Sequence, residues 1–300
     1  MGQKDITEKI LLDYNEIFSD IINVLLFDGE NVVAPETLEN ATPVSQYKAD
    51  DSKVHEQERD VAKFWRGNNI RIALLGIENE TRPERDMVFR IIGYDGAAYR
   101  SQLLDEGGER FPVITIVLYF GDRHWTAPKK ISELIDIPDK LQPYFSDYKL
   151  NVFEISWLSD EQAAMFQSDF GIVADFFINK RKDKNYRPAD KRVIKHVDEV
   201  LKLLSVMTGD NRYEEILRVP GKEDIQSMCD VAERLVTVGR TEERRSIFMD
   251  LVKDGVLTPE EAEARSGIPA SEFKKANKKK KQNEGTRIEI LILRRKYFSW

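Results

Sequence analysis

The segment from residue 61 to residue 80 restricts the fold most, because it reads as two strands joined by a tight turn. Its sequence is VAKFWRGNNIRIALLGIENE. GNN at 67–69 has the residue types of a hairpin turn and separates two apolar, strand-like halves. Residues two apart on a strand share a face, so the Glu78 and Glu80 carboxylates point the same way at the end of the second strand. The sequence therefore predicts a sheet with a buried strand that ends in two acids.

Asp60 stands immediately before the first of these strands, and the hairpin would bring it back towards Glu78. Carboxylates are costly to bury unless they bind something positive. Two or three of them can hold Mg²⁺, which polarises a phosphodiester bond. An acid, a hairpin and a Glu-x-Glu end to the second strand are the layout of a metal-dependent nuclease core. The alternative is a surface hairpin with ordinary solvated charges.

Other kinds of catalytic site find little support in the sequence. One cysteine and three separated histidines provide no zinc-binding spacing. Glycine-rich phosphate loops and serine or cysteine nucleophile motifs are absent. The single cysteine, Cys229, excludes an internal disulfide and suits a reducing compartment. The carboxylates remain the one constellation with enough members for catalysis.

The hydropathy pattern predicts a cytoplasmic protein that does not enter the membrane. The longest apolar run, residues 113–120, is too short to cross a bilayer. The apolar stretch at residues 21–27 comes too late, and between acids, to be a signal peptide.

Charge is distributed unevenly along the 300 residues, whose formal net charge is −7. From Lys274 to the C-terminus there are 10 basic and 2 acidic side chains, which leaves 36 basic against 51 acidic in the preceding part. An acidic body argues against a general polyphosphate binder. A nuclease interpretation must therefore assign phosphate neutralisation to a bound cation and to a local basic patch.

Apolar spacing predicts an α/β core followed by helices. The expected elements are, in order, a helix from residue 5 that ends at Asp28-Gly29, extended segments near 32–33 and 46–47, the hairpin, a helix over 86–104, strands over 113–120 and 150–159, and helices from residue 160 onwards. The expected domains are an α/β nuclease-like core over 1–160, a helical region over 161–275, and a basic, disordered tail over 276–300.

Two C-terminal segments each permit two interpretations. Residues 257–276 contain helix starts on both sides of Gly267 and resemble a helix-turn-helix, which either reads DNA or serves as a packing unit. The last residues join a lysine run to an apolar run without periodicity. They are either a basic arm for nucleic acid or the product of a frame-shift after a poly-adenine tract.

Taken together, five segments resemble the Rpn family of recombination-promoting nucleases, also called YhgA-like putative transposases. They are NEIFSDIINVLLFDGE, HEQERDVAKFW, IALLGIENET, RIIGYDGAAYRSQL and VITIVLYFGDRHWTAPKKISEL. The resemblance covers roughly residues 5–275. It implies a PD-(D/E)XK-like nuclease core, a mixed sheet flanked by helices, with a helical C-terminal region.

The resemblance also implies roles for individual residues. Asp60, Glu78 and Glu80 would be catalytic, and Asp60 and Glu78 would bind Mg²⁺ or Mn²⁺ together with Asp20 of the first helix. Glu80 departs from the family pattern, because relatives usually carry glutamine at this position. An extra carboxylate would tighten metal binding but cannot donate a hydrogen bond to a phosphate unless it is protonated.

We therefore expect a metal-dependent DNA endonuclease that promotes recombination by hydrolysing phosphodiester bonds. Its partners would be double-stranded DNA and a second copy of the chain, and Arg90 and Tyr94 would position the substrate. One alternative is a catalytically weakened DNA- or protein-binding relative, because Glu80 replaces the usual residue. Another is an antitoxin-like or dimerising partner that acts through the helical half.

Overall fold

The computed structural model describes residues 10–41, 44–48, 54–58, 60–67, 70–104 and 108–274. The chain divides into two compact units, Met1–Ala232 and Glu233–Trp300. We predicted a boundary after residue 160, but helices beyond it share the first unit with the sheet. Helix α5 (Asp169–Lys182) belongs to the first unit because it contacts both α2 (Asn15–Phe27) and the turn that follows the last strand. The predicted tail, 276–300, lies outside the described residues.

A five-stranded mixed sheet forms the centre of the first unit, as expected for an α/β core. Its strands, in spatial order, are β1 (Leu38–Asn40), β4 (Val61–Gly67), β5 (Ile70–Glu80), β6 (Val113–Tyr119) and β7 (Asn151–Glu154). Strands β1, β4 and β5 pair antiparallel, whereas β5, β6 and β7 run parallel. The carboxyl ends of three strands therefore meet at one edge of the sheet.

The predicted hairpin is confirmed by the pairing of β4 with β5. Val61 lies opposite Ile77, so Asp60 is carried to the level of Glu78. The short strands were harder to predict. β1 was not expected, and neither was β3 (Val54–Glu58), which pairs with β2 (Val44–Lys48) in a separate two-stranded sheet. Val32 and Val33, expected to be extended, belong to no strand.

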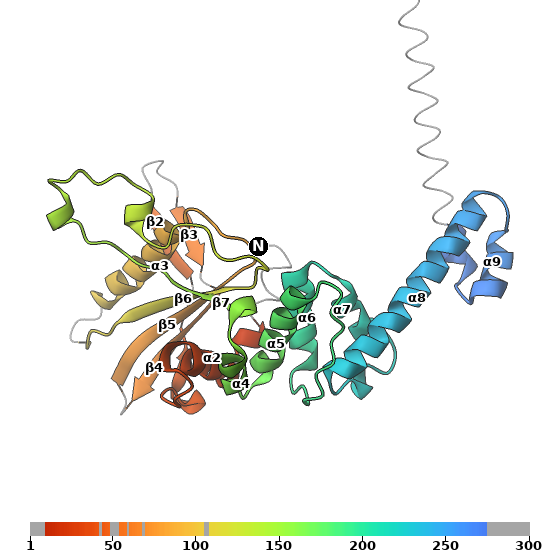
Figure 1. Ribbon diagram of the computed structural model, residues 1–300, viewed down its shortest axis with the longest axis horizontal. Helices are drawn as coiled ribbons and strands as arrows, with labels where there is room; N and C mark the ends of the chain where they lie inside the picture. Colours follow the sequence, from red (N-terminus) through yellow and green to blue (C-terminus); the bar gives the residue numbers. More distant parts are fainter. Residues whose placement is uncertain are drawn as a thin grey trace, which may run out of the picture. The chain divides into compact units, whose positions relative to one another are not determined.

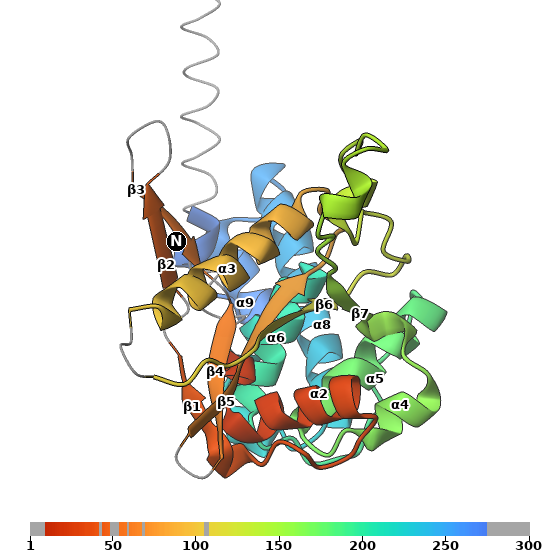
Figure 2. The same ribbon diagram turned by 90° about the vertical axis from the view of Figure 1, so that its left-hand side faces the viewer.

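Helix α3 (Met87–Gln102) connects β5 to β6 and covers one face of the sheet (Figures 1 and 2). Its apolar residues pack in a buried cluster with side chains of β6 and of the segment that follows. The buried members are Met87, Val88, Ile91, Tyr94, Val117, Tyr119, Trp125, Ile131 and Leu150. Val117 and Tyr119 are register partners of Glu78 and Glu80. The two acids therefore lie on the face that α3 covers.

Helices α2 (Asn15–Phe27) and α5 (Asp169–Lys182) lie on the other face (Figure 2). Phe120 at the end of β6 contacts Phe170 and Phe177 of α5, with ring centroids 6.4 and 5.0 Å away. Helix α2 ends at Asp28, in the left-handed conformation, where the sequence predicted its end.

A lysine is fully buried between α2 and the sheet. Lys63 of β4 has no exposed surface, and its ammonium lies 5.7 Å from the centre of the Phe18 ring. Its Nζ donates to the backbone and side-chain oxygens of Asp13, at 2.8 and 3.1 Å, and to the side chain of Asn40. Burying a charge requires such partners, so Lys63 joins β4 to the neighbouring strand β1 and to the segment just before α2.

Helices complete the first unit and form the second. They are α4 (Asp160–Met165), α6 (Val197–Thr208), α7 (Arg212–Glu215), α8 (Met228–Lys253) and α9 (Pro259–Ser266). The order of the helices agrees with the helical spacing predicted from residue 160 onwards. No helix in the described part of the chain is long and apolar enough to cross a membrane.

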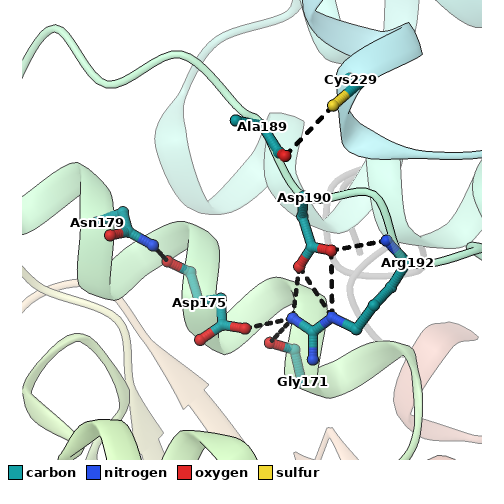
Figure 3. A network of polar contacts seen from close by, with 7 residues as sticks. All are labelled: Gly171, Asp175, Asn179, Ala189, Asp190, Arg192 and Cys229. Carbon is teal, nitrogen blue, oxygen red and sulfur yellow. Dashed lines mark hydrogen bonds and ion pairs between the residues drawn. The ribbon is translucent and has the colours of Figure 1, made fainter.

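A polar network fastens the segment after α5 to its neighbours (Figure 3). The guanidinium of Arg192 pairs with Asp175 and Asp190 and donates to the carbonyl oxygen of Gly171 at 3.3 Å. The Cys229 thiol, at the start of α8, donates to the carbonyl oxygen of Ala189. These contacts hold an irregular segment between two helices.

The second unit contains the helix pair predicted on either side of Gly267. Thr258 caps α9 in a reciprocal capping box with Glu261, and Gly267 ends the helix with a φ of 76°. Phe273 and Ala262 are fully buried in the core of this unit. The pair therefore has a packing role, and DNA reading stays a prediction.

Candidate functional site

Glu78, near the carboxyl end of β5, is an almost completely buried carboxylate, with 1% of its surface exposed. Its Oε1 accepts a hydrogen bond from the backbone N–H of Asp60, at 3.2 Å. Its Oε2 accepts from Nη2 of Arg90, at 2.8 Å. The hairpin and α3 thus bring one partner each to this side chain.

Arg90, in the first turn of α3, binds three carboxylates at once. Its Nη2 lies 2.8 Å from both Glu78 and Glu80, and its Nη1 lies 2.6 Å from Glu84. Its Nε is buried and has no hydrogen-bond partner in the described part of the structure. The positive partner of both Glu78 and Glu80 in this arrangement is therefore the guanidinium of Arg90.

Burial controls the protonation of the two glutamates. It raises the pKa of Glu78 to about 8, with a further increase from the nearby charge of Asp60, and Arg90 only partly opposes this. The pKa of Glu80 is also raised, mainly by burial, and Arg90 again works in the opposite direction. Both side chains therefore keep a proton to a higher pH than an exposed glutamate does, even beside the guanidinium.

Asn79, between the two glutamates, was missed as a site residue. Its backbone N–H and its side-chain amide donate to Oδ2 of Asp60, at 2.8 and 3.3 Å, and so fix that carboxylate beside Glu78. Its Oδ1 is buried without a hydrogen-bond partner among the described atoms. The sequence does contain one indication of this role, because Asn79 is a polar residue on the face of β5 that carries the apolar Ala73, Leu75 and Ile77.

The carboxylate oxygens of these acids are suitable ligands for a hard cation such as Mg²⁺, but their positions match a metal site only in part. Among the described residues, no three His, Cys, Asp or Glu side chains are grouped so that they could hold a metal ion. Asp60 and Glu78 nevertheless adjoin each other, and Mg²⁺ is commonly bound by one or two carboxylates together with water and substrate phosphate. Asp60 and Glu78 therefore fit such a cation as a pair.

The structure places Asp20 elsewhere, in a structural contact. Its carboxylate accepts from the backbone N–H groups of Gln167 and Ser168, at 2.8 to 3.1 Å, at the start of α5. A carboxylate is stabilised there by the exposed N–H groups and the helix dipole. Asp20 also lines a pocket of about 290 Å³, and Asp60, Glu78 and Glu80 are not among the residues that line this pocket. Metal binding by Asp20 stays a prediction, because its carboxylate is engaged away from the other acids.

Tyr94, expected to position substrate, is a core residue. Only 5% of its surface is exposed, and it packs in the cluster between α3 and β6. Tyr94 lies one helical turn after Arg90 on α3, and the structure places it among the packed side chains of the core.

Comparison with known proteins identifies one family. Residues 63–184 match the model of a family described as putative transposase, YhgA-like. This match confirms the resemblance over most of β4 through α5, a region that contains Glu78, Glu80 and Arg90, whereas Asp20 and Asp60 precede it. No curated protein matches the chain. No solved structure matches it either.

Proposed function

We propose that this transposase-related chain is a metal-dependent DNA endonuclease with a PD-(D/E)XK-like core, which hydrolyses phosphodiester bonds and promotes recombination. The observation that supports it most is the junction of Asp60 with buried Glu78 at neighbouring strand ends, with the Asp60 N–H bonded to the Glu78 carboxylate. Glu78 lies on a strand whose carboxyl end meets those of two parallel neighbours. Ligands of open α/β sheets bind at this edge.

In this proposal, Asp60 and Glu78 would hold Mg²⁺ or Mn²⁺, and the ion, when bound, would polarise the phosphodiester. Asn79 keeps the Asp60 carboxylate in place through two hydrogen bonds. Glu80, when protonated, can donate a hydrogen bond to a phosphate oxygen, and burial raises its pKa in that direction.

Arg90 has two roles in the proposed reaction. Without a cation it neutralises Glu78 and Glu80 and so keeps the acids together. Once it is released from a glutamate, the guanidinium of Arg90 would bind the phosphate through charge-assisted N–H hydrogen bonds. Substrate positioning by Arg90 therefore depends on its release from at least one glutamate.

The remaining expectations belong to the same proposal. The substrate is double-stranded DNA, the protein works as a homodimer, and its compartment is the cytoplasm. The absence of a membrane-spanning helix from the described residues is compatible with this setting.

A second candidate function is supported by the same ion pairs. Arg90 ties Glu78 to Glu80 through a single nitrogen, at 2.8 Å from each. If that arrangement persists when DNA binds, the chain is a catalytically weakened DNA- or protein-binding relative. Turnover distinguishes the two functions.

The test is cleavage of supercoiled plasmid with Mg²⁺, Mn²⁺, Ca²⁺ or EDTA. Wild type should nick the plasmid with Mg²⁺ or Mn²⁺, and Asp60→Ala should reduce the rate at least about 100-fold. Asp86→Ala is the matched control. Asp86 is exposed at the N-cap position of α3, and its side chain forms no capping hydrogen bond there. DNA binding without cleavage in any metal would select the weakened relative, and full activity of Asp60→Ala would refute the assigned site.

A further inference from the structure

A pocket of about 380 Å³ lies directly beside the candidate site, at the carboxyl edge of the parallel strands. The segments that follow β5, β6 and β7 each contribute to its wall. Thr81 follows Glu80, Phe120 to Asp122 follow β6, and Ser156 follows β7. The backbone N–H of Phe120 donates to the carbonyl oxygen of Glu80 at 2.8 Å, which joins the pocket wall to the acidic strand end.

The pocket is basic in an otherwise acidic chain. Lys180 and Arg181 of α5, together with Lys184 beyond it, line the pocket along with one acid, Asp122. These charges leave an excess of two positive charges, whereas the chain as a whole carries −7. Within the described ranges, none of the three basic side chains forms a salt bridge with a carboxylate. By contrast, Lys182 pairs with Asp160.

A helix C-terminus favours basic residues in any protein, but two observations go beyond that effect. Lys184 lies outside the helix and is exposed. Arg181 is already oriented, because its Nε donates to the carbonyl oxygen of Ser156 at 2.7 Å and its guanidinium lies 4.0 Å from the centre of the Trp157 ring. A guanidinium fixed in this way loses little conformational entropy when it binds an anion.

We infer that this pocket binds the sugar-phosphate backbone of duplex DNA beside the cleavage site, an inference that rests on the proposed function. Thr81 follows Glu78 by three residues, or roughly 10 Å of extended chain. Successive phosphates of one strand rise by about 3.4 Å along the duplex axis. Lys180, Arg181 and Lys184, which line the same pocket as Thr81, thus contact phosphates that neighbour the one at the acids, and they supply the positive charge that the acids lack.

The test is fluorescence anisotropy with a labelled 20-base-pair duplex in EDTA, where no cleavage occurs, over a series of salt concentrations. The variant is Lys180→Gln/Lys184→Gln, which should weaken binding about tenfold for any DNA sequence and lower the salt-dependence slope by about 1.8, or about 0.9 for each phosphate that a lysine no longer neutralises. The matched control, Lys140→Gln/Lys149→Gln, removes two exposed lysines that do not line the pocket and should leave the slope unchanged.

Lys180 lies 5.4 Å from the Phe176 ring, so a folding defect is controlled with two further variants. Lys184→Gln alone should lower the slope by about 0.9, and Lys180→Arg/Lys184→Arg should restore binding. If wild type cleaves plasmid but the glutamine pair binds like the control, the pocket inference fails while the endonuclease proposal stands. If single-stranded RNA of equal length displaces the duplex more strongly than unlabelled duplex does, the assignment to DNA is wrong. Absence of both binding and cleavage in wild type overturns both proposals.

Discussion

Replacing Arg90 with methionine separates the two kinds of carboxylate that this side chain binds. In the structure, the side chains of Glu84 and Glu80 are 42% and 18% exposed, whereas that of Glu78 is 1% exposed. Water can solvate Glu84, and partly Glu80, when the guanidinium is gone. Glu78 can only remain as a buried charge or take up a proton. Arg90→Met should therefore destabilise the protein by an amount that depends on pH.

The magnitude follows from the pKa of Glu78, which is about 8 in the folded protein and 4.5 for an ordinary glutamate. Because the folded state holds this proton more tightly, wild-type stability falls as pH rises from about 4.5 to about 8. At pH 6, Glu78 is protonated in wild type and variant alike, and the loss of the other pairs costs about 1–2 kcal/mol. Removal of Arg90 raises the pKa of Glu78 further, so at pH 9 only wild type has released the proton. Because pH 9 lies one unit above the wild-type pKa of Glu78, the stability lost in Arg90→Met should be about 1.4 kcal/mol larger at pH 9 than at pH 6.

The measurement is urea unfolding in metal-free buffer at pH 6 and pH 9, followed by tryptophan fluorescence. Arg100→Met is the control, since Arg100 is exposed in the last turn of the same helix and forms no salt bridge within the described residues. Its effect should stay below about 0.5 kcal/mol at both pH values. Addition of Mg²⁺ should stabilise Arg90→Met more than wild type, because the ion no longer competes with a guanidinium.

An equal loss of stability at pH 6 and pH 9 would refute the reasoning, because Glu78 would then not change its protonation between them. The variant Glu78→Gln provides the internal check. It removes the titrating group, so Arg90→Met in that background should show no additional loss at pH 9.

Two further predictions concern Glu80 and Asp20. Glu80→Gln should raise the single-turnover rate of plasmid cleavage about 30- to 1,000-fold at saturating Mg²⁺, because the amide donates to a phosphate oxygen and removes a repelling charge. A slower variant at every Mg²⁺ concentration would make Glu80 a working ligand. Asp20→Ala should lower stability by about 1–2 kcal/mol, through the N–H groups it leaves at the start of α5, and should not change the Mg²⁺ dependence of cleavage. A shifted Mg²⁺ dependence would restore Asp20 as a metal ligand.

The central features of the fold were predictable because they depend on local pattern. Alternating and apolar runs around GNN specify β4 and β5, and the pairing of these strands then brings Asp60 to Glu78 without further information. The end of α2 at Asp28 and the start of α9 after Thr258 follow from capping and turn residues in the same way. These elements need contacts only with their own neighbours in sequence.

Features that depend on distant contacts could not be predicted. β1 has three residues, Leu38–Asn40, and is specified by its pairing with β4 more than by its own composition. Asp20 accepts hydrogen bonds from the backbone of Gln167 and Ser168, almost 150 residues later, so its sequence neighbourhood carries no sign of that role. The pairing of Arg90 with both glutamates requires the position of α3 over the sheet. Periodicity places Arg90 on the helix but not over the acids.

Charge balance connects the acidic strand end to the basic pocket. When ionised, Asp60, Glu78, Glu80 and Glu84 carry four negative charges, and Arg90 alone offsets one of them, so three remain. A divalent cation leaves one, and a phosphodiester adds another, so DNA would meet net repulsion at the cleavage site. The two excess positive charges that line the neighbouring pocket match this remainder. The cation and the pocket therefore each reduce the repulsion that DNA meets at this edge, and removing the pocket charges should weaken binding more in EDTA than in Mg²⁺.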